Sequence, residues 1–218
     1  MTRSTPTPDR SDGQMDPQFT DDLRELGEAI DDLAGETSYI TRALTENLRA
    51  MRPVSREGRL TKQQEQFLIQ SGTFTADELE ATKREVDRGS LQLGAAEAFL
   101  SNLCATMSLD DVTGYLNLDE EAVRTAVSEG RLYAIEISGR LRFPAWQFNV
   151  GSPEKLIPGL ADVISVVTPR WDWQSVAGFM ATPQSDLFAE GRQTPVEWLR
   201  DGGDVNDIRE IVESDDWW

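Results

Sequence analysis

The sequence predicts a mostly α-helical chain with one small β-hairpin in its middle. Apolar residues recur at three- and four-residue steps in the first fifty residues and again after Pro153, which is the spacing of amphipathic helices. Between these regions the turn dipeptide Ser138-Gly139 separates two short runs of alternating polarity, which predicts paired strands. We expect four segments: a disordered tail at 1–16, a helical region at 17–105, a helix-and-hairpin module at 106–150 and a helical domain at 153–218.

Composition narrows the chemistry that the chain can perform. Its 218 residues include 39 acidic and 21 basic side chains, no histidine and one cysteine, and the net charge is −18. The lack of histidine removes the commonest general base and the commonest transition-metal ligand. The sequence also has no glycine-rich phosphate loop and no nucleophile elbow. We therefore expect a protein that is not an enzyme and that needs no metal or cofactor.

The same composition bears on location. The first residues lack the apolar stretch of a secretory signal, and no apolar run reaches the ~20 residues of a membrane span. The single Cys104 cannot form an internal disulfide, which suits a reducing compartment. We expect a cytoplasmic protein that contacts no membrane. Its negative field repels phosphate polymers unless a local basic patch offsets it.

The N-terminal region carries a regular apolar stripe. Its members alternate steps of four and three residues: Phe19, Leu23, Leu26, Ile30 and Leu33. The register resumes after Gly35, and Arg52-Pro53 ends it, so we expect two helices with a break near Gly35. The stripe either covers the core as a helical hairpin or forms the seam of a homodimer.

A basic run lies at 49–62 and ends this first helical pair. Its cationic members are Arg49, Arg52, Arg56, Arg59 and Lys62. The run is either a solvated linker or an arm that contacts phosphates. From capping and stop signals we expect three further helices, over 61–70, 75–87 and 91–106.

The middle segment, residues 108–148, has the most distinctive order of signals. Ser108 caps a first helix, Asn117-Leu118 forms a turn, Asp119 caps a second helix and Gly130 ends it. A Gly-Arg-Leu exit, a two-strand wing and the closing run RFPAWQF follow. This layout resembles the helix-turn-helix of the excisionase/MerR family. The resemblance implies a small winged helix-turn-helix that binds DNA.

In that family the second helix and the wing contact DNA. The candidate contacts are the polar and basic side chains of these elements: Arg124, Thr125, Ser128, Arg131, Arg140 and Arg142. Three carboxylates oppose them at the start of the second helix, Asp119, Glu120 and Glu121, where they would repel phosphates. Two interpretations therefore stay open, a module that reads DNA and a helix-turn-helix kept as a protein-docking scaffold.

The C-terminal segment closes with a strong helix start at Thr194, where Pro195 and Glu197 complete the pattern. Its motif order over residues 155–214 resembles the toxin-binding domain of the Xre/MbcA/ParS antitoxins. The matching positions are Phe179, Pro183, Leu187, Gly191, Arg192, Thr194, Pro195, Trp198, Leu199 and Gly202. The resemblance implies a protein partner, such as a RES-type toxin that degrades NAD, with Phe179, Arg192 and Trp198 at the contact.

Two indoles follow at Trp217 and Trp218, and each can bury ~200 Å² of surface. They either fold back onto the domain or fill a pocket of the partner, and we count them among the candidate partner-binding residues. Together these features predict a DNA-binding transcriptional regulator of antitoxin type that represses its own operon and binds a toxin or another protein. The alternative is an acidic adaptor or inhibitor whose helix-turn-helix does not contact DNA.

Overall fold

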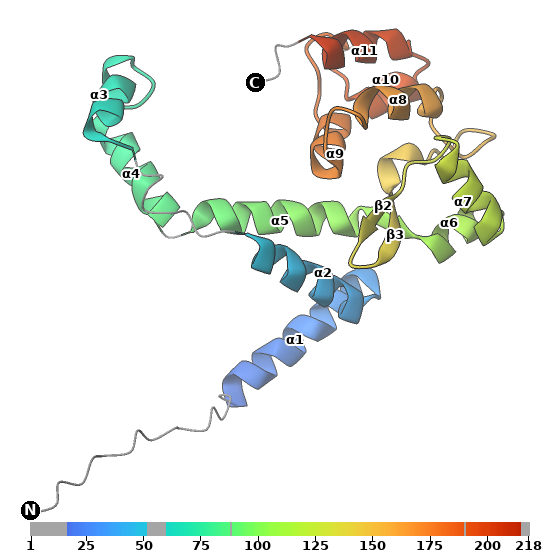
Figure 1. The fold of residues 1–218 in the computed structure, drawn as a ribbon, viewed down its shortest axis with the longest axis horizontal. Coiled ribbons are helices and arrows are strands. Elements are labelled where there is room, and N and C mark those ends of the chain that lie inside the picture. The colour runs from blue at the N-terminus through green and yellow to red at the C-terminus, as the bar shows by residue number, and fades with distance from the viewer. Residues whose placement is uncertain (1–16, 52–59, 88, 190, 215–218) are drawn as a thin grey trace, which may run out of the picture. The chain divides into compact units, whose positions relative to one another are not determined.

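The structure is a computed structural model that describes residues 17–51, 60–87, 89–189 and 191–214. The predicted tail at 1–16 and the indoles at 217 and 218 lie outside these ranges. The chain divides into two compact units, Met1–Thr41 and Arg42–Trp218, and each is described by itself. The prediction of a mostly helical chain with a small sheet is confirmed (Figure 1). The four predicted segment boundaries stay predictions.

The first unit contains α1 (Pro17–Ala34) and the start of α2 (Thr37–Ala50). The expected break near Gly35 is confirmed, because Gly35 has φ of +65° and its amide donates to the carbonyl of Asp31. A positive φ is accessible to glycine without the steric cost that a side chain adds. The hydroxyl of Thr37 then donates to the Asp31 carboxylate at 2.9 Å, which fixes the start of the second helix.

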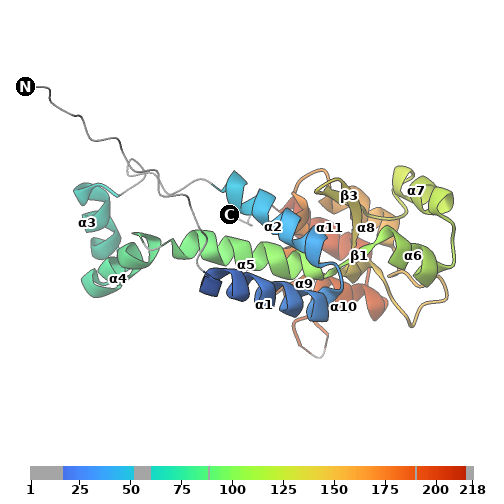
Figure 2. The same ribbon diagram turned by 90° about the horizontal axis from the view of Figure 1, so that it is seen from below.

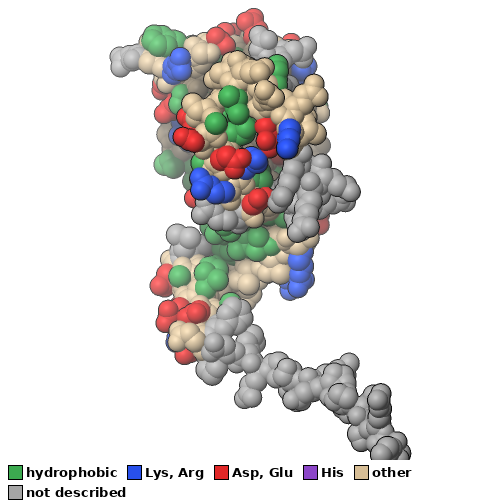
Figure 3. All heavy atoms as spheres, turned by 90° about the vertical axis from the view of Figure 1, so that its left-hand side faces the viewer, with side chains coloured by type: hydrophobic (Ala, Val, Ile, Leu, Met, Phe, Trp, Pro, Cys, Tyr) green, Lys and Arg blue, Asp and Glu red, His purple; other side chains and the backbone are tan. Residues whose placement is uncertain are grey.

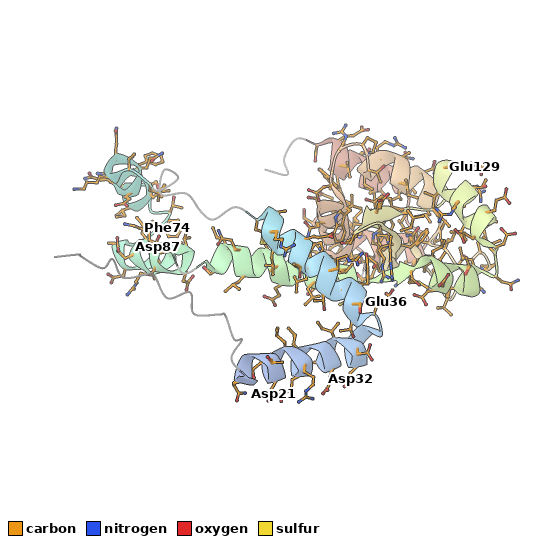
Figure 4. The ribbon with its side chains drawn as sticks, turned by 60° about the horizontal axis from the view of Figure 1, so that its bottom comes forward. Asp21, Asp32, Glu36, Phe74, Asp87 and Glu129 are labelled. Carbon is orange, nitrogen blue, oxygen red and sulfur yellow. The ribbon has the colours of Figure 1, made fainter. Side chains whose placement is uncertain are left out.

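The second unit holds the rest of α2 and the remaining helices. These are α3 (Lys62–Gln70), α4 (Ala76–Asp87), α5 (Ser90–Cys104), α6 (Leu109–Leu116), α7 (Glu120–Ser128), α8 (Leu160–Val167), α9 (Trp173–Ala181), α10 (Pro195–Arg200), α11 (Val205–Glu213) and the short 3-10 helix η2 (Ala145–Gln147). The helix α5 lies between the α3–α4 pair and the sheet (Figure 2). Asp87 is the last residue of α4, and Phe74 lies in the turn between α3 and α4; both are labelled in Figure 4.

The sheet has three antiparallel strands, one more than expected. They are β1 (Thr106–Ser108), β2 (Ile135–Ile137) and β3 (Arg140–Pro144), in the order β1-β3-β2. Met107 lies opposite Phe143, and Glu136 lies opposite Leu141. The expected helix over 91–106 therefore ends early, at Cys104, because Thr106 belongs to β1. The predicted β2–β3 hairpin is present, and β3 is its inner strand.

One hydrophobic core of the second unit joins the α6–α7 pair, the sheet and the C-terminal helices. Its fully buried members include Val112 of α6, Val123 of α7 and Phe143 of β3, together with Val163 and Leu199 from the C-terminal segment. The guanidinium of Arg200 also donates to the carbonyl of Phe148 at 3.1 Å. One face of α7 packs on this core, which holds the helix in place and leaves its opposite face exposed.

Away from this core, part of the second unit leaves apolar side chains at the surface. Phe67, Leu91 and Leu93 are exposed on α3 and α5, and Figure 3 shows hydrophobic side chains reaching the surface among acidic and basic ones. Within the described residues, no helix has both the length and the apolar character needed to cross a bilayer.

Candidate nucleic-acid interface

The first helix of the candidate interface, α6, begins at a reciprocal cap. The Ser108 hydroxyl accepts a hydrogen bond from the amide of Asp111 at 3.1 Å, and the Asp111 carboxylate accepts from the amide of Ser108 at 3.0 Å. Each bond satisfies an amide that the helix itself leaves without a partner. Hydrogen bonds from the Ser108 side chain and then its backbone lower the pKa of the Asp111 carboxyl group.

Replacing Ser108 with alanine is expected to lower the free energy of unfolding by about 1 kcal/mol, the usual value of an N-cap. Folding lowers the pKa of the Asp111 carboxyl group, so the ionised carboxylate stabilises the folded state at any pH above the ordinary carboxyl pKa. This stabilisation is lost as the pH falls through the lowered pKa of the folded protein. Urea unfolding of the full chain at neutral and acidic pH measures both effects. Equal stability of S108A and the wild type at neutral pH would contradict the capping role.

The connection to α7 is a tight left-handed turn. Asn117 adopts φ of +57° and ends α6, a conformation that asparagine tolerates better than most residues. The Asp119 carboxylate then accepts from the amide of Ala122 at 2.7 Å and caps α7. The two caps, with buried Val112 and Val123 between the helices, set α7 in place.

The two faces of α7 differ sharply. Val123 and Ala126 are buried in the core, whereas the opposite face is exposed. The residues of this outer face line a shallow open depression of about 480 Å³: Glu120, Glu121, Arg124, Thr125 and Ser128. We call these five residues the α7 outer face. They supply charged donors, charged acceptors and hydroxyls at one accessible surface.

Acidic neighbours hold two of the predicted DNA-contacting arginines. The guanidinium of Arg124 lies 2.8 Å from the Glu120 carboxylate, and that of Arg131 lies 2.6 Å from the Glu129 carboxylate. Glu129 directly follows α7 (Figure 4). All four side chains are more than half exposed. Exposed pairs of this kind contribute about 0–1 kcal/mol, so a phosphate or a base can replace the carboxylate at small cost.

The remaining two predicted arginines, Arg140 and Arg142, differ in exposure. Arg140 is exposed beside the hairpin turn, where the Ser138 hydroxyl donates to Glu46 of α2. Arg142 is only 4% exposed. Its guanidinium donates to the hydroxyl of Thr106 at 2.9 Å and to the carbonyl of Thr106 at 3.1 Å. Its burial and its bonds to Thr106 of β1 keep this side chain inside the protein and away from the candidate interface, and no finding tests the predicted contact of Arg142 with DNA.

Two of the candidate partner-binding residues have structural roles in the C-terminal segment. Phe179 is buried, and its ring centroid lies 5.0 Å from that of Trp171. Trp198 is half-buried, donates from Nε1 to the carbonyl of Asp204 and packs over Gly203. Phe179 is therefore enclosed by the domain, whereas Trp198 packs within it and keeps part of its surface exposed.

Arg192 alone of the described partner-binding candidates is exposed. It lies opposite Phe188 in a short backbone bridge, and Phe188 is 66% exposed. The sequence reasoning missed Phe188, although an aromatic residue in a polar loop next to the matched Leu187 was a usable signal. Among the described residues no group of three or more potential metal ligands comes together.

Comparisons with known proteins add little to this geometry. No protein-family model matches the chain, and a search of curated proteins finds no significant match. A search of solved structures finds the NMR structure of Rv2175c, with 20% sequence identity and a TM-score of 0.37. The similar region covers 49% of this chain and 75% of that chain. A similarity this low supports no inference about fold or function.

Proposed function

We propose that the chain is a cytoplasmic DNA-binding transcriptional regulator of antitoxin type. In this proposal residues 106–150 form a winged helix-turn-helix of the excisionase/MerR kind, with α7 as the recognition helix and the β2–β3 hairpin as the wing. The C-terminal segment binds a toxin or another protein, and the chain represses its own operon. These assignments extend the resemblances that the sequence carries.

The observation that supports this proposal best is the α7 outer face. The helix α7 packs on the core with one face, follows a tight turn and precedes a hairpin. Its other face presents polar side chains to solvent, and no described element of the second unit covers them. This is the arrangement that a major groove accepts. The proposed contacts are Arg124, Thr125, Ser128, Arg131 and Arg140, with Arg142 removed from the original set.

Electrostatics set the conditions under which binding is expected. The net charge of −18 opposes approach to DNA. Among the described residues, the guanidinium groups of Arg124 and Arg131 lie against carboxylates, which a phosphate must first displace. Binding is therefore expected to be weak at physiological salt and measurable at low salt, where phosphate contacts contribute most.

Alanine at Arg124 or Arg140 is expected to weaken DNA binding, each by about fivefold or more, because each change removes one charged contact. A low-salt gel-shift screen of genomic fragments with the full chain measures this effect. Arg209→Ala on α11, which removes an equal charge away from the α7 outer face, is the matched control. If both variants leave every shift unchanged, residues 106–150 are not the DNA reader.

For the C-terminal segment we propose Phe188 and Arg192 as the protein contact. Both side chains are exposed, and aromatic residues and arginine are both enriched at protein interfaces. A RES-type toxin encoded by the adjacent reading frame is the partner that the resemblance suggests. Co-purification of that product with the full chain, and its loss in Phe188→Ser, tests the assignment.

A homodimer through α1 accompanies this proposal. Leu23 and Leu26 lie on the predicted apolar stripe, and they are 47% and 54% exposed. Within the first unit this leaves both side chains available for a seam with a second chain, which is the interpretation that we propose. Sedimentation of the full chain, compared with Leu26→Gln, tests it.

A second function is favoured by a different observation. The acids at 119–121 begin α7, and neighbouring carboxylates hold Arg124 and Arg131. A surface with this charge suits an acidic adaptor or inhibitor that binds a basic protein and no DNA. A pull-down that returns one stoichiometric basic protein free of nucleic acid would support this function over the first.

A further inference from the structure

We infer that the α7 outer face reads consecutive G·C base pairs, with Arg124 on a guanine and Glu121 on a cytosine. The inference rests on the proposed DNA-binding function and specifies the sequence that this function would select. The carboxylates of α7 are the feature that most opposes DNA binding, and the inference gives one of them, Glu121, a hydrogen bond to a base.

The spacing of the two side chains fits adjacent base pairs. Glu121 and Arg124 are three residues apart on α7 and both are exposed. Side chains at this separation are neighbours on one helix face, with Cβ atoms about 5–6 Å apart. Successive base pairs of B-DNA are about 3.4 Å apart along the helix axis. The two side chains can therefore reach the same pair or adjacent pairs.

Arg124 is oriented before it meets a ligand. Its Nε and Nη2 atoms lie 2.9 Å and 2.8 Å from the same oxygen of Glu120. A guanidinium carries five N–H donors in a fixed fork, so holding one edge directs the other edge away from Glu120. Guanine offers the matching acceptors, O6 and N7, on its major-groove edge.

Glu121 has a different environment. Across the described part of the chain its carboxylate has no hydrogen-bond or ion-pair partner, and it faces the open depression. An ionised carboxylate only accepts hydrogen bonds. In the major groove the donors are the amino groups of cytosine and adenine. Adenine places its acceptor N7 beside that amino group and would repel the second carboxylate oxygen, so cytosine is the better match.

The simpler account of Glu121 is that a carboxylate in the first turn stabilises α7 through the helix dipole and has no role on DNA. The two accounts predict different results for Glu121→Gln. If Glu121 reads no base, it acts on DNA only through its charge, and the neutral variant binds every sequence more tightly by a similar factor. If it reads cytosine, the variant loses its preference at one position, and glutamine favours adenine there because it matches N6 and N7.

The test is selection from a random DNA library by the full chain at low salt, followed by affinity measurements on the selected site and on single-base variants. The proteins are the wild type, Glu121→Gln, Arg124→Ala and the charge-matched control Glu213→Gln on α11, each checked for an unchanged melting temperature. We expect the wild type to select adjacent G·C pairs and to discriminate at each by about tenfold.

The outcomes separate the inference from the proposed function. Support requires that Glu121→Gln moves the preference at one position from cytosine toward adenine, that Arg124→Ala removes the guanine preference, and that Glu213→Gln changes neither. Selection of a site without G·C pairs, or a uniform rise in affinity for Glu121→Gln, overturns the inference and leaves the DNA-binding function standing. If the wild type selects no sequence at all, the proposed function fails and the inference fails with it.

Discussion

Replacing Arg142 with alanine is expected to lower the free energy of unfolding by about 3 kcal/mol. The side chain is 4% exposed, and its guanidinium donates to both the hydroxyl and the carbonyl of Thr106. The same hydroxyl donates to the carbonyl of Leu103, so Arg142 links β3 through β1 to α5. Its removal leaves a cavity and buried acceptors without a donor, and both effects are costly. Urea denaturation of the full chain measures the loss.

Arg140→Ala is the control, because it removes the same group from an exposed position two residues away on β3. Its stability is expected to stay within about 0.5 kcal/mol of the wild type. Thr106→Val adds a second test, since the Arg142 and Thr106 changes should be less than additive if they break one network. Arg142→Ala with wild-type stability and reduced DNA affinity would show instead that this arginine faces a ligand.

Alanine at Trp198 is expected to cost about 3 kcal/mol of unfolding free energy, within the range for removing a packed indole. The indole closes the turn between α10 and α11, where Nε1 donates to the carbonyl of Asp204 and the ring lies over Gly203. Alanine at Gly203 is expected to cost about 2 kcal/mol, because its Cβ would overlap the indole ring. Thermal unfolding of each full-length variant gives the two values.

The double variant distinguishes packing from a general defect at the turn. With Trp198 already shortened to alanine, the added methyl group at Gly203 meets open space, and the second change should cost little. Fully additive losses would contradict the packing account. Trp198→Ala that keeps wild-type stability but loses a protein partner would return Trp198 to the binding surface.

Local signals in the sequence predicted much of the helical framework. Ser108, Asp119 and Thr194 were predicted as caps, and each accepts the expected backbone hydrogen bond. The break at Gly35 was also predicted correctly. Caps and breaks depend on a few adjacent residues, so a sequence records them directly.

Long-range pairing was not predictable in the same way. The strand β1 has only three residues, Thr106–Ser108, and it directly follows a helix. So short a segment carries too little alternation to indicate a strand. Without β1, the sequence predicts a two-stranded hairpin in which β3 is an edge strand and Arg142 is exposed. The missed strand is therefore the reason that the burial of Arg142 was not predicted.

The candidate site was only partly predictable for a related reason. The outward positions of α7 follow from the helical period once Val123 and Ala126 are placed inside, and Arg124, Thr125 and Ser128 do line the exposed face. Phe179 and Trp198 were chosen through family motifs. A motif does not distinguish a residue that holds a fold from one that meets a partner, and these two side chains pack within the domain.

The central claim is that the α7 outer face binds DNA. The most direct measurement is the affinity of the full chain for a labelled duplex, by fluorescence anisotropy across a range of salt concentrations, with Arg140→Ala and Arg209→Ala alongside. The account predicts sequence-dependent binding whose logarithm falls linearly with the logarithm of salt concentration. It also predicts a slope that becomes shallower by about one in Arg140→Ala and stays unchanged in Arg209→Ala. Absence of binding at the lowest salt, or identical slopes for all three proteins, would contradict it.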